Sequence, residues 1–239
     1  IFQEMTHEKV TEKGAADYVT NVDVAVQKYL KEALGNEFPD IALIAEEKEN
    51  LGLDPDKSYW ILDPIDGTTN LIRDYHLSAV SLGLYENGEI TFGVVYNPFT
   101  EELFYGAKGE GAYLNGAPIQ VSDQPEFKDA VVSFGSSPYE KNRAKELFPI
   151  FYNIFMSCAD FRRTGSAALD ICYVACGRQH AYLEQNLKPW DYSGASIILR
   201  EAGGTITDWG NKELPYLANS DILACVPQFR EILLKLINA

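Results

Sequence analysis

The chain has 239 residues, and 46% of them are hydrophobic, so it is long enough to bury a sizeable core. Its 35 acidic residues outnumber its 20 basic ones, and the resulting net charge of −15 would repel nucleic acids and anionic membranes and attract cations. No apolar run approaches membrane-spanning length, and the opening segment IFQEMTHEKV lacks the pattern of a signal peptide.

The first half of the chain predicts one helix followed by several short strands. The helix begins near Val22, because the apolar residues after it recur on one helical face as far as Leu34, and Gly35 lies near its end. Asn87 and Gly88 are typical of the tight turn of a hairpin. The strands expected in this half are segments 41–45 and 58–63, the two arms of the hairpin within 81–98, and segments 102–107 and 111–116.

After about residue 128 the pattern changes to strands separated by helices. Gly177 stops one of these helices, while Pro189 near the start of another and Gly203 just past its end are typical helix boundaries. The expected strands are 130–134, 180–184 and 221–226, and the expected helices are 140–151, 166–176, 189–202 and a final one after 226. With no linker or repeat, we expect one α/β domain over residues 1–239, with lobes of about 1–128 and 129–239.

The four cysteines, Cys158, Cys172, Cys176 and Cys225, do not form a recognisable metal-binding pattern. No Cys-x-x-Cys pair occurs, and no nearby histidine completes a zinc site. We therefore expect plain buried thiols in a reducing compartment, which is the cytoplasm.

The segment DPIDGTTN, Asp63 to Asn70, follows the strand expected at 58–63. A capped turn is one explanation, because Asp-Pro and Asp-Gly pairs commonly form turns. The segment does not fit an EF-hand loop, which requires acidic residues at alternate positions. It also lacks the nucleophile of haloacid-dehalogenase phosphatases, because Pro64 stands two residues before Asp66.

Other acidic residues also fall at the ends of predicted elements. Asp17 and Asp23 flank YVTNV at the start of the first helix, Glu46 and Glu47 follow a strand, and Asp191 lies in the first turn of a helix. Each has a structural explanation of its own, such as a favourable charge at a helix N-terminus. Gathered in one cleft they would repel one another, and oxygen ligands without histidine or cysteine favour Mg²⁺ over zinc.

Four longer segments carry a resemblance to a known family. They are WILDPIDGTTNL (60–71), GEGAYLNG (109–116), GSAALDICYVACGR (165–178) and WDYSGASIILREAGG (190–204). Together they make the chain similar, along nearly its whole length, to the inositol monophosphatase superfamily of magnesium-dependent, lithium-sensitive phosphatases. Members of that family usually carry a longer N-terminal helix before the segment equivalent to 13–23, so we expect that helix to be truncated here. The sequence starts at Ile1, which leaves open whether residues precede it.

The resemblance implies an α/β fold with layers in the order α/β/α/β/α and two mixed or antiparallel sheets. It also implies two to three Mg²⁺ ions in each active site. Glu46, Asp63 and the carbonyl of Ile65 would hold the first ion, and Asp63, Asp66 and Asp191 would hold the second. A third and weaker ion would lie near Glu46.

The resemblance further assigns catalytic and substrate-binding residues. Thr68 would pair with Asp17 and, together with Glu46, position the attacking water, while Gly67 and Thr68 would offer backbone N–H groups to the phosphate. In-line attack without a phosphoenzyme is expected. The substrate contacts implied are Asp66, Gly67, Thr68, Ser166, Ala167, Glu184 and Asp191. Asp23 and Glu47 are expected to support the site without binding metal.

The most strongly indicated activity is hydrolysis of inositol 1-phosphate, because Glu184 stands where family members place a carboxylate that contacts ring hydroxyls. A solvated residue at a strand end is the alternative explanation of Glu184, and Arg162 or Arg163 could neutralise a second phosphate. Fructose 1,6-bisphosphate, 3′-phosphoadenosine 5′-phosphate, histidinol phosphate and NADP remain alternative substrates. A relative that binds metal or sugar phosphate without catalysis is the alternative of a different class.

The family also commonly forms homodimers, and a segment of the second lobe offers apolar candidates for such an interface. These residues could equally belong to the core. The candidates are Phe151, Tyr152, Ile154, Phe155 and Met156.

Overall fold

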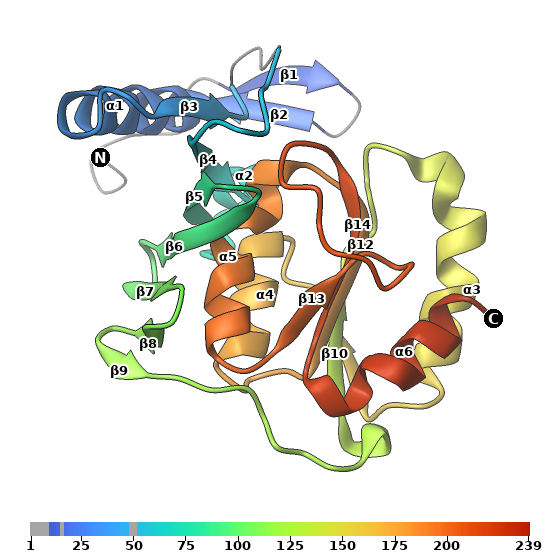
Figure 1. The fold of residues 1–239 in the computed structure, drawn as a ribbon. Helices are drawn as coiled ribbons and strands as arrows, with labels where there is room; N and C mark the ends of the chain where they lie inside the picture. Colours follow the sequence, from blue (N-terminus) through green and yellow to red (C-terminus); the bar gives the residue numbers. More distant parts are fainter. Residues whose placement is uncertain (1–9, 15–16, 48–51) are drawn as a thin grey trace.

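The chain forms alternating layers of helices and β-sheets (Figure 1). The computed structural model describes residues 10–14, 17–47 and 52–239, and the side chains of residues 13–19 lie outside this description. Helices α4 (Ala167–Ala175) and α5 (Pro189–Glu201) lie between two sheets, as Figure 1 shows. Further helices cover the outer faces, so the expected α/β/α/β/α arrangement with two mixed or antiparallel sheets is confirmed.

The first sheet has seven strands in the order β3-β4-β5-β6-β7-β8-β9. Only the β3–β4 pair is parallel among these strands, which otherwise follow one another as an antiparallel meander. The predicted hairpin is confirmed as β5 and β6, with Asn87 and Gly88 at φ angles of 52° and 90°. The strands are β3 (Ala42–Ala45), β4 (Tyr59–Asp66), β5 (Ala79–Glu86), β6 (Glu89–Asn97), β7 (Glu102–Ala107), β8 (Gly111–Leu114) and β9 (Ala117–Pro118).

The second sheet has five strands in the order β11-β10-β12-β14-β13. Helices α3 (Ala144–Phe155) and α6 (Arg230–Ile237) cover its outer face (Figure 1). The strands are β10 (Val131–Phe134), β11 (Asp160–Arg162), β12 (Ala181–Leu187), β13 (Thr205–Thr207) and β14 (Ser220–Cys225). Short 3₁₀ turns at Phe127–Asp129, Lys141–Arg143 and Pro227–Phe229 precede strand β10 and the two outer helices.

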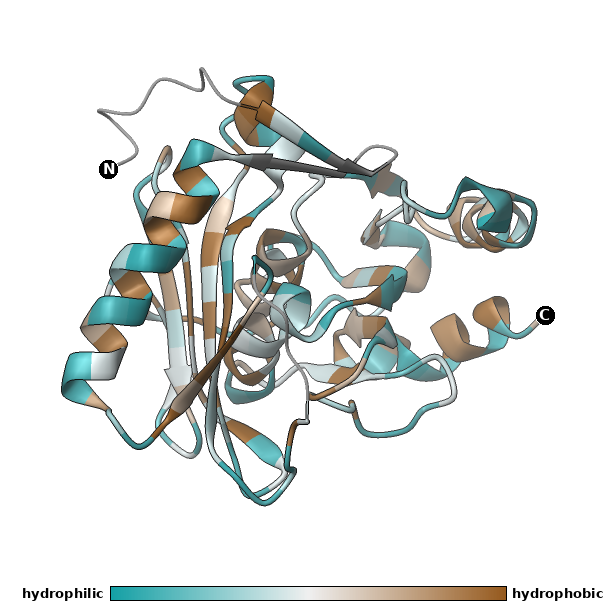
Figure 2. Ribbon diagram, turned by 90° about the horizontal axis from the view of Figure 1, so that it is seen from above, coloured by the Kyte–Doolittle hydropathy of each residue, from teal (hydrophilic) through white to brown (hydrophobic). Residues whose placement is uncertain are grey.

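Helix α1 (Asn21–Glu37) covers the first sheet and contacts strand β4. Its ribbon alternates between hydrophilic and hydrophobic residues in Figure 2, and Val22 and Val26 on its inner face pack against Ile65 and Leu71. The helix starts with a capping box, in which Thr20 and Asp23 bond each other's backbone N–H groups. A hairpin of β1 (Val10–Gly14) and β2 (Asp17–Thr20), which the sequence did not predict, precedes it.

The first core lies between the two sheets, and α5 approaches the first sheet at backbone distance. A Cβ atom added at Gly93 of β6 would lie 2.1 Å from the carbonyl oxygen of Gly194 in α5. Gly83 of β5 meets the same helix, where an added Cβ would lie 3.1 Å from the Gly194 nitrogen. The contact at Gly93 requires glycine, because a side chain there would push the helix away from the sheet, while the contact at Gly83 is tight.

Two sequence predictions about elements need correction. The helix expected at 140–151 lies at Ala144–Phe155, because Lys141–Arg143 form a 3₁₀ turn and Ile154 extends the buried face by one turn. Strand β4 does not end at Asp63 but runs to Asp66, with a register shift between these residues that accommodates the proline. Of the five interface candidates, Phe151 and Ile154 belong to the hydrophobic core between helix α3 and the second sheet, which is the alternative that the sequence left open for this segment.

All four cysteines are free thiols; Cys172 and Cys225 are buried, and the other two are half-buried. Burial raises the pKa of the Cys225 thiol to about 11, which favours its protonated form. Within the described parts of the chain, no helix is both long enough and apolar enough to cross a bilayer.

Candidate active site

Strand β4 places two buried carboxylates at one end of the first sheet. All eight of its residues are buried, and Asp63 and Asp66 are 2% and 7% exposed. Asp63 accepts a hydrogen bond from the Ile65 N–H at 2.9 Å, which holds its side chain against the bulge around Pro64. The register shift thus lets two acids three residues apart both face the interior.

Four of the predicted carboxylates lie close enough to repel one another. Burial raises the pKa of Asp63 well above its usual value, and the charges of Glu46, Asp66 and Asp191 raise it further. Burial likewise raises the pKa of Asp191, followed by the charges of Asp66 and Glu46. Glu46 reaches this group because its backbone N–H bonds the Leu62 carbonyl at 3.3 Å, which extends the pairing of β3 with β4.

Asp66 also joins the first sheet to helix α4. Its carboxylate accepts hydrogen bonds from the Ser166 hydroxyl at 2.6 Å and from the Ala168 N–H at 2.7 Å. Burial raises the pKa of Asp66 to about 7, while these two bonds act in the opposite direction. Ser166 and Ala167, at the start of α4, therefore lie beside the carboxylate cluster.

Asp191 serves the start of helix α5 as well as the cluster. Its carboxylate accepts a hydrogen bond from the Lys188 N–H at 2.7 Å, and Pro189 occupies the first helical turn. The short segment between β12 and α5 thereby fixes Asp191 beside Asp66 and Asp63.

Thr68 contacts a carboxylate of helix α1. The Thr68 hydroxyl is within hydrogen-bonding distance of an Asp23 carboxylate oxygen, at 3.2 Å, and of the Ile65 carbonyl, at 3.1 Å. The prediction that Thr68 pairs with Asp17 stays a prediction, because the Asp17 side chain lies outside the described residues; among the described side chains, the carboxylate that Thr68 meets is that of Asp23. Asp23 is on the buried face of α1, which packs against the strand that leads into Thr68.

Gly67 forms the turn between Asp66 and the short helix α2 (Thr68–Ile72). Its φ angle of 86° lies in the left-handed region that favours glycine, and it is the N-cap residue of α2. This conformation turns the chain sharply at the carboxylate cluster, so the backbone of Gly67 and Thr68 lies directly beside Asp66.

Glu184 of β12 is held by the protein itself and is not a freely solvated residue at a strand end. Its carboxylate accepts hydrogen bonds from the Tyr182 hydroxyl at 2.5 Å and from the Ser137 N–H at 3.0 Å. Gly135 makes this placement possible, because a Cβ atom there would lie 1.8 Å from the carboxyl carbon of Glu184. Burial raises the pKa of Glu184, and the nearby charge of Arg163 lowers it.

The two arginines considered from the sequence lie in different environments. Arg163 is close enough to Glu184 to influence its pKa. Arg162 instead pairs with Asp160 on the surface, and both of these side chains are about half exposed. Of the two, Arg163 alone has a described contact with the candidate site.

The donor set fits a hard divalent cation by its chemistry. Burial and the charges of other carboxylates raise the pKa values of Asp63 and Asp191, and no cationic side chain of the described residues is among the main causes that lower them. Among the described residues, however, no three carboxylate, imidazole or thiol groups already stand at the spacing of a metal centre. The cluster thus has the charge and the oxygen ligands that Mg²⁺ requires, while its side chains are not drawn together as a preformed centre.

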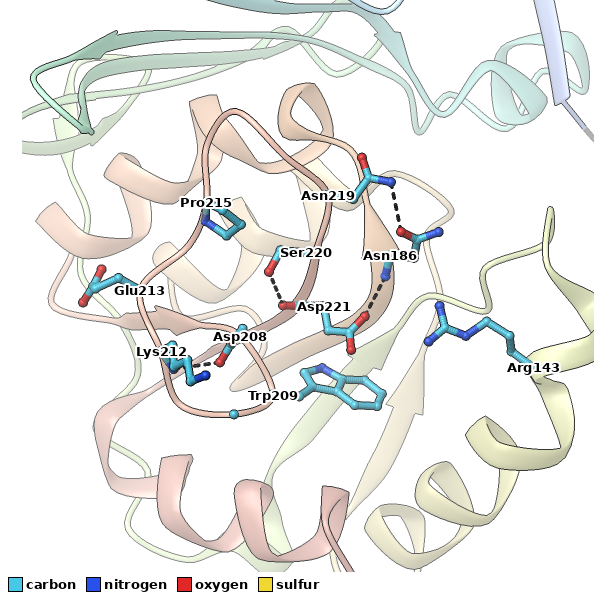
Figure 3. Close-up of a pocket in the computed structure, with 11 residues that line it drawn as sticks. Arg143, Asn186, Asp208, Trp209, Lys212, Glu213, Pro215, Asn219, Ser220 and Asp221 are labelled. Atoms are coloured by element: carbon cyan, nitrogen blue, oxygen red, sulfur yellow. Dashed lines mark hydrogen bonds between the residues drawn. The ribbon is translucent and has the colours of Figure 1, made fainter. Parts of the chain in front are cut away.

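A polar pocket of about 480 Å³ lies elsewhere, between Arg143 and the 208–221 segment (Figure 3). Its charged groups are largely occupied by structural bonds. Asp208 accepts a hydrogen bond from a backbone N–H of its own turn, and Asp221 accepts one from the Asn186 N–H. Arg143 forms an ion pair with Glu140. None of the predicted site residues lines this pocket, so the carboxylate cluster remains the better candidate.

Sequence reasoning missed several residues that build the site. Tyr182 and Ser137, which orient Glu184, lie two residues before it and 47 before it in the chain. Asn70, within the segment DPIDGTTN, bonds a carbonyl 94 residues away. The spacing of Thr20 and Asp23 was a signal for the capping box, but nothing in it indicated the bond to Thr68.

Comparisons with known proteins place the chain in a family. A family model described as the inositol monophosphatase family matches residues 1–239. The Nus factor SuhB of Vibrio cholerae serotype O1 is 37% identical over 220 residues, which cover 92% of this chain and 82% of that protein.

Solved structures of family members have the same fold. The inositol monophosphatase from Anabaena (Nostoc) sp. PCC 7120 has a TM-score of 0.85 and 37% identity, covering 90% of this chain and 85% of that chain. An IMPase/NADP phosphatase complexed with Mg²⁺ and phosphate has a TM-score of 0.88 and 28% identity, covering 99% of this chain and 87% of that chain.

Proposed function

The chain belongs to the inositol monophosphatase family, and we propose that it is a Mg²⁺-dependent phosphomonoesterase whose preferred substrate is inositol 1-phosphate. One observation carries the proposal. Four carboxylates, Glu46, Asp63, Asp66 and Asp191, are gathered beside the Gly67–Thr68 turn, where the charges of the other three raise the pKa of Asp63 and those of Asp66 and Glu46 raise the pKa of Asp191. Such an arrangement is unfavourable for a purely structural site and is favourable where cations and a phosphate bind together.

Each carboxylate has a part in holding metal in this proposal. Glu46, Asp63 and the Ile65 carbonyl would hold a first Mg²⁺, and Asp63, Asp66 and Asp191 would hold a second, with a weaker third ion near Glu46. When bound, the ions would neutralise phosphate oxygens, acidify a water molecule and stabilise the departing oxygen. A family relative described as complexed with Mg²⁺ and phosphate supports this choice of cation.

Thr68 and Asp23 would orient the attacking water. The Thr68 hydroxyl can donate its proton to the buried Asp23 carboxylate, which leaves the oxygen lone pairs free to accept a hydrogen bond from water. Glu46 would hold the same water from the other side. The backbone N–H groups of Gly67 and Thr68 would bind phosphate oxygens, so that water and phosphate meet in line.

Glu184, Ser166 and Ala167 would contact the alcohol that leaves. Each Glu184 oxygen already accepts one hydrogen bond from the protein and can accept another, so the carboxylate can bind two adjacent hydroxyl groups. A dual-specific IMPase/NADP phosphatase of the same fold is described with D-inositol-1-phosphate bound, at 27% identity. NADP is accordingly the first of the alternative substrates, ahead of fructose 1,6-bisphosphate and nucleotide or histidinol phosphates.

Lithium sensitivity is part of the same proposal. A staphylococcal inositol monophosphatase of this fold, 29% identical, is described as an inhibitory complex soaked in LiCl. In this chain Li⁺ would replace the second Mg²⁺ between Asp66 and Asp191 after hydrolysis and retain phosphate, which gives uncompetitive inhibition.

A substrate panel tests the specificity. Initial rates of phosphate release are measured with Mg²⁺ for inositol 1-phosphate, NADP, fructose 1,6-bisphosphate, 3′-phosphoadenosine 5′-phosphate and histidinol phosphate. We expect the highest kcat/KM for inositol 1-phosphate. A higher value for another member would reassign the substrate, and no release from any of them would support a non-catalytic binding protein.

A further inference from the structure

Asn70 closes the segment DPIDGTTN and has no part in the site described above. It lies in helix α2 and is 8% exposed. Its side-chain nitrogen donates to the Leu77 carbonyl at 2.7 Å and to the Thr164 carbonyl at 2.9 Å. Both N–H groups of the Asn70 amide therefore have an acceptor, and they join the segment at Leu77 to the segment at Thr164.

These bonds lie where two turns of the site touch. Gly67 and Gly165 both have a φ angle of +86°, and a Cβ atom added at Gly67 would lie 3.2 Å from the Gly165 carbonyl oxygen. A Cβ atom added at Gly165 would lie 3.2 Å from the side-chain atoms of Asn70. The Asn70 amide thus fills the space beside the two glycine turns.

Thr164 is anchored on its other side by a buried polar chain. Its hydroxyl donates to Asp170 at 2.8 Å and also lies 3.1 Å from the Ser166 N–H, which donates to it. Asp170 in turn accepts from the Gln179 side chain at 3.0 Å. Thr164 is therefore fixed within its own loop. Loss of the hydrogen bond from Asn70 to Thr164 would displace this loop as a unit.

We propose that Asn70 is a positioning residue that sets the separation between the Gly67–Thr68 turn and the Gly165–Ala167 loop. This inference rests on the proposed function, in which the turn binds phosphate and the loop contacts the leaving alcohol. The other bonds across this contact run through Asp66 to Ser166 and Ala168. Without Asn70 the loop would stay attached but shift, and a hydroxyl-rich alcohol would be held less well than a simple one.

The test compares Asn70→Ala with Asn97→Ala. Asn97 is a matched control, because it is fully buried and its side-chain nitrogen also donates to a backbone carbonyl, that of His76, at 3.1 Å. With Mg²⁺ present, kcat and KM are measured for inositol 1-phosphate and for p-nitrophenyl phosphate, and backbone hydrogen exchange is followed over residues 164–169. Asn70→Ser, which is smaller but polar, is used in the same way if Asn70→Ala does not fold.

We expect Asn70→Ala to lower kcat/KM about tenfold more for inositol 1-phosphate than for p-nitrophenyl phosphate, because the Thr164 carbonyl loses its buried donor. Exchange over 164–169 should also accelerate, and Asn97→Ala should do neither. Equal losses on both substrates together with unchanged exchange would overturn the proposal. If the wild-type protein releases no phosphate, the proposed function falls, and the exchange measurement alone decides whether Asn70 positions the loop.

Discussion

Asp63 is a residue whose ionisation is opposed by its surroundings. It is almost fully buried and is surrounded by three other acids, so its charge is opposed by burial and by repulsion together. In the proposed function that charge bridges two cations. Asp63 should therefore lower the stability of the metal-free protein and be essential to the activity of the Mg²⁺-bound protein.

We expect Asp63→Asn to reduce phosphate release by several orders of magnitude while raising the melting temperature of the metal-free protein by a few degrees. The amide keeps the shape but removes the bridging charge and the repulsion. Activity with saturating Mg²⁺ and thermal unfolding in EDTA measure the two effects. Asp208→Asn, a change in the surface turn, is the control, and near-wild-type turnover of Asp63→Asn would refute the assignment.

Glu184 is expected to select substrates with adjacent hydroxyl groups. Charge-assisted hydrogen bonds contribute about 1.5–3 kcal/mol each, so Glu184→Gln should cost roughly ten- to a hundredfold in kcat/KM for inositol 1-phosphate and much less for p-nitrophenyl phosphate. Gly135→Ala should produce the same selective loss, because its Cβ would displace the Glu184 carboxylate.

Steady-state kinetics on both substrates would test this, with Glu213→Gln as a control, since Glu213 pairs with Arg200 at 2.6 Å. A parallel loss on both substrates would show that Glu184 does not determine specificity.

At the scale of elements, helix α5 couples the packing of the fold to the position of Asp191. Gly93→Ala should destabilise the protein by about 1–3 kcal/mol, because the new Cβ would lie 2.1 Å from the Gly194 carbonyl and would force α5 off the sheet. Activity should fall as well, because Asp191 moves with the helix. Gly35→Ala in α1 is the control, since an added Cβ has no neighbour within 4 Å there. Equal denaturant midpoints for Gly93→Ala and the wild type would contradict the packing argument.

The elements also show how far sequence reasoning reaches. Local patterns predicted the β5–β6 hairpin through Asn87 and Gly88, and helix α5 through Pro189, because turn and cap chemistry is contained in a few neighbouring residues. The same patterns could not predict that Thr68 bonds Asp23, 45 residues away, or that β4 continues through Pro64. Those features depend on tertiary packing, which no short spacing encodes.

For the whole molecule, the buried acids should make the metal-free protein lose stability as pH rises. Unfolded aspartate has a pKa of about 3.9, whereas burial raises the pKa of Asp66 to about 7 and that of Asp170 to about 6. The folded state therefore holds more protons between these values, and its stability falls as pH increases through them. His180, whose pKa is lowered by burial, acts in the opposite direction at low pH.

Thermal unfolding in EDTA at several values between pH 5 and pH 8 measures this effect. We expect the melting temperature to fall across that range and Mg²⁺ to restore more of it at pH 8 than at pH 5, because ionised carboxylates bind the cation. A melting temperature that rises with pH in EDTA would contradict the placement of these acids.

The outer face of α3 is the surface on which we expect two copies of the chain to associate. Phe148, Tyr152, Phe155 and Met156 are 48–65% exposed and follow one another at helical spacing on this face. Light scattering at low micromolar concentration should give the mass of two chains for the wild type and the mass of one chain for Tyr152→Glu. Tyr29→Glu, at an exposed aromatic residue of α1, should leave it unchanged. A wild-type mass of one chain would refute the dimer.

The central claim is that the carboxylate cluster becomes a phosphatase site by binding Mg²⁺. Phosphate release from inositol 1-phosphate, measured on EDTA-treated protein as Mg²⁺ is titrated back, tests it most directly. We predict no release in EDTA and a saturable return of activity with Mg²⁺. Release at the full rate in EDTA, or none at any Mg²⁺ concentration from folded protein, would contradict it.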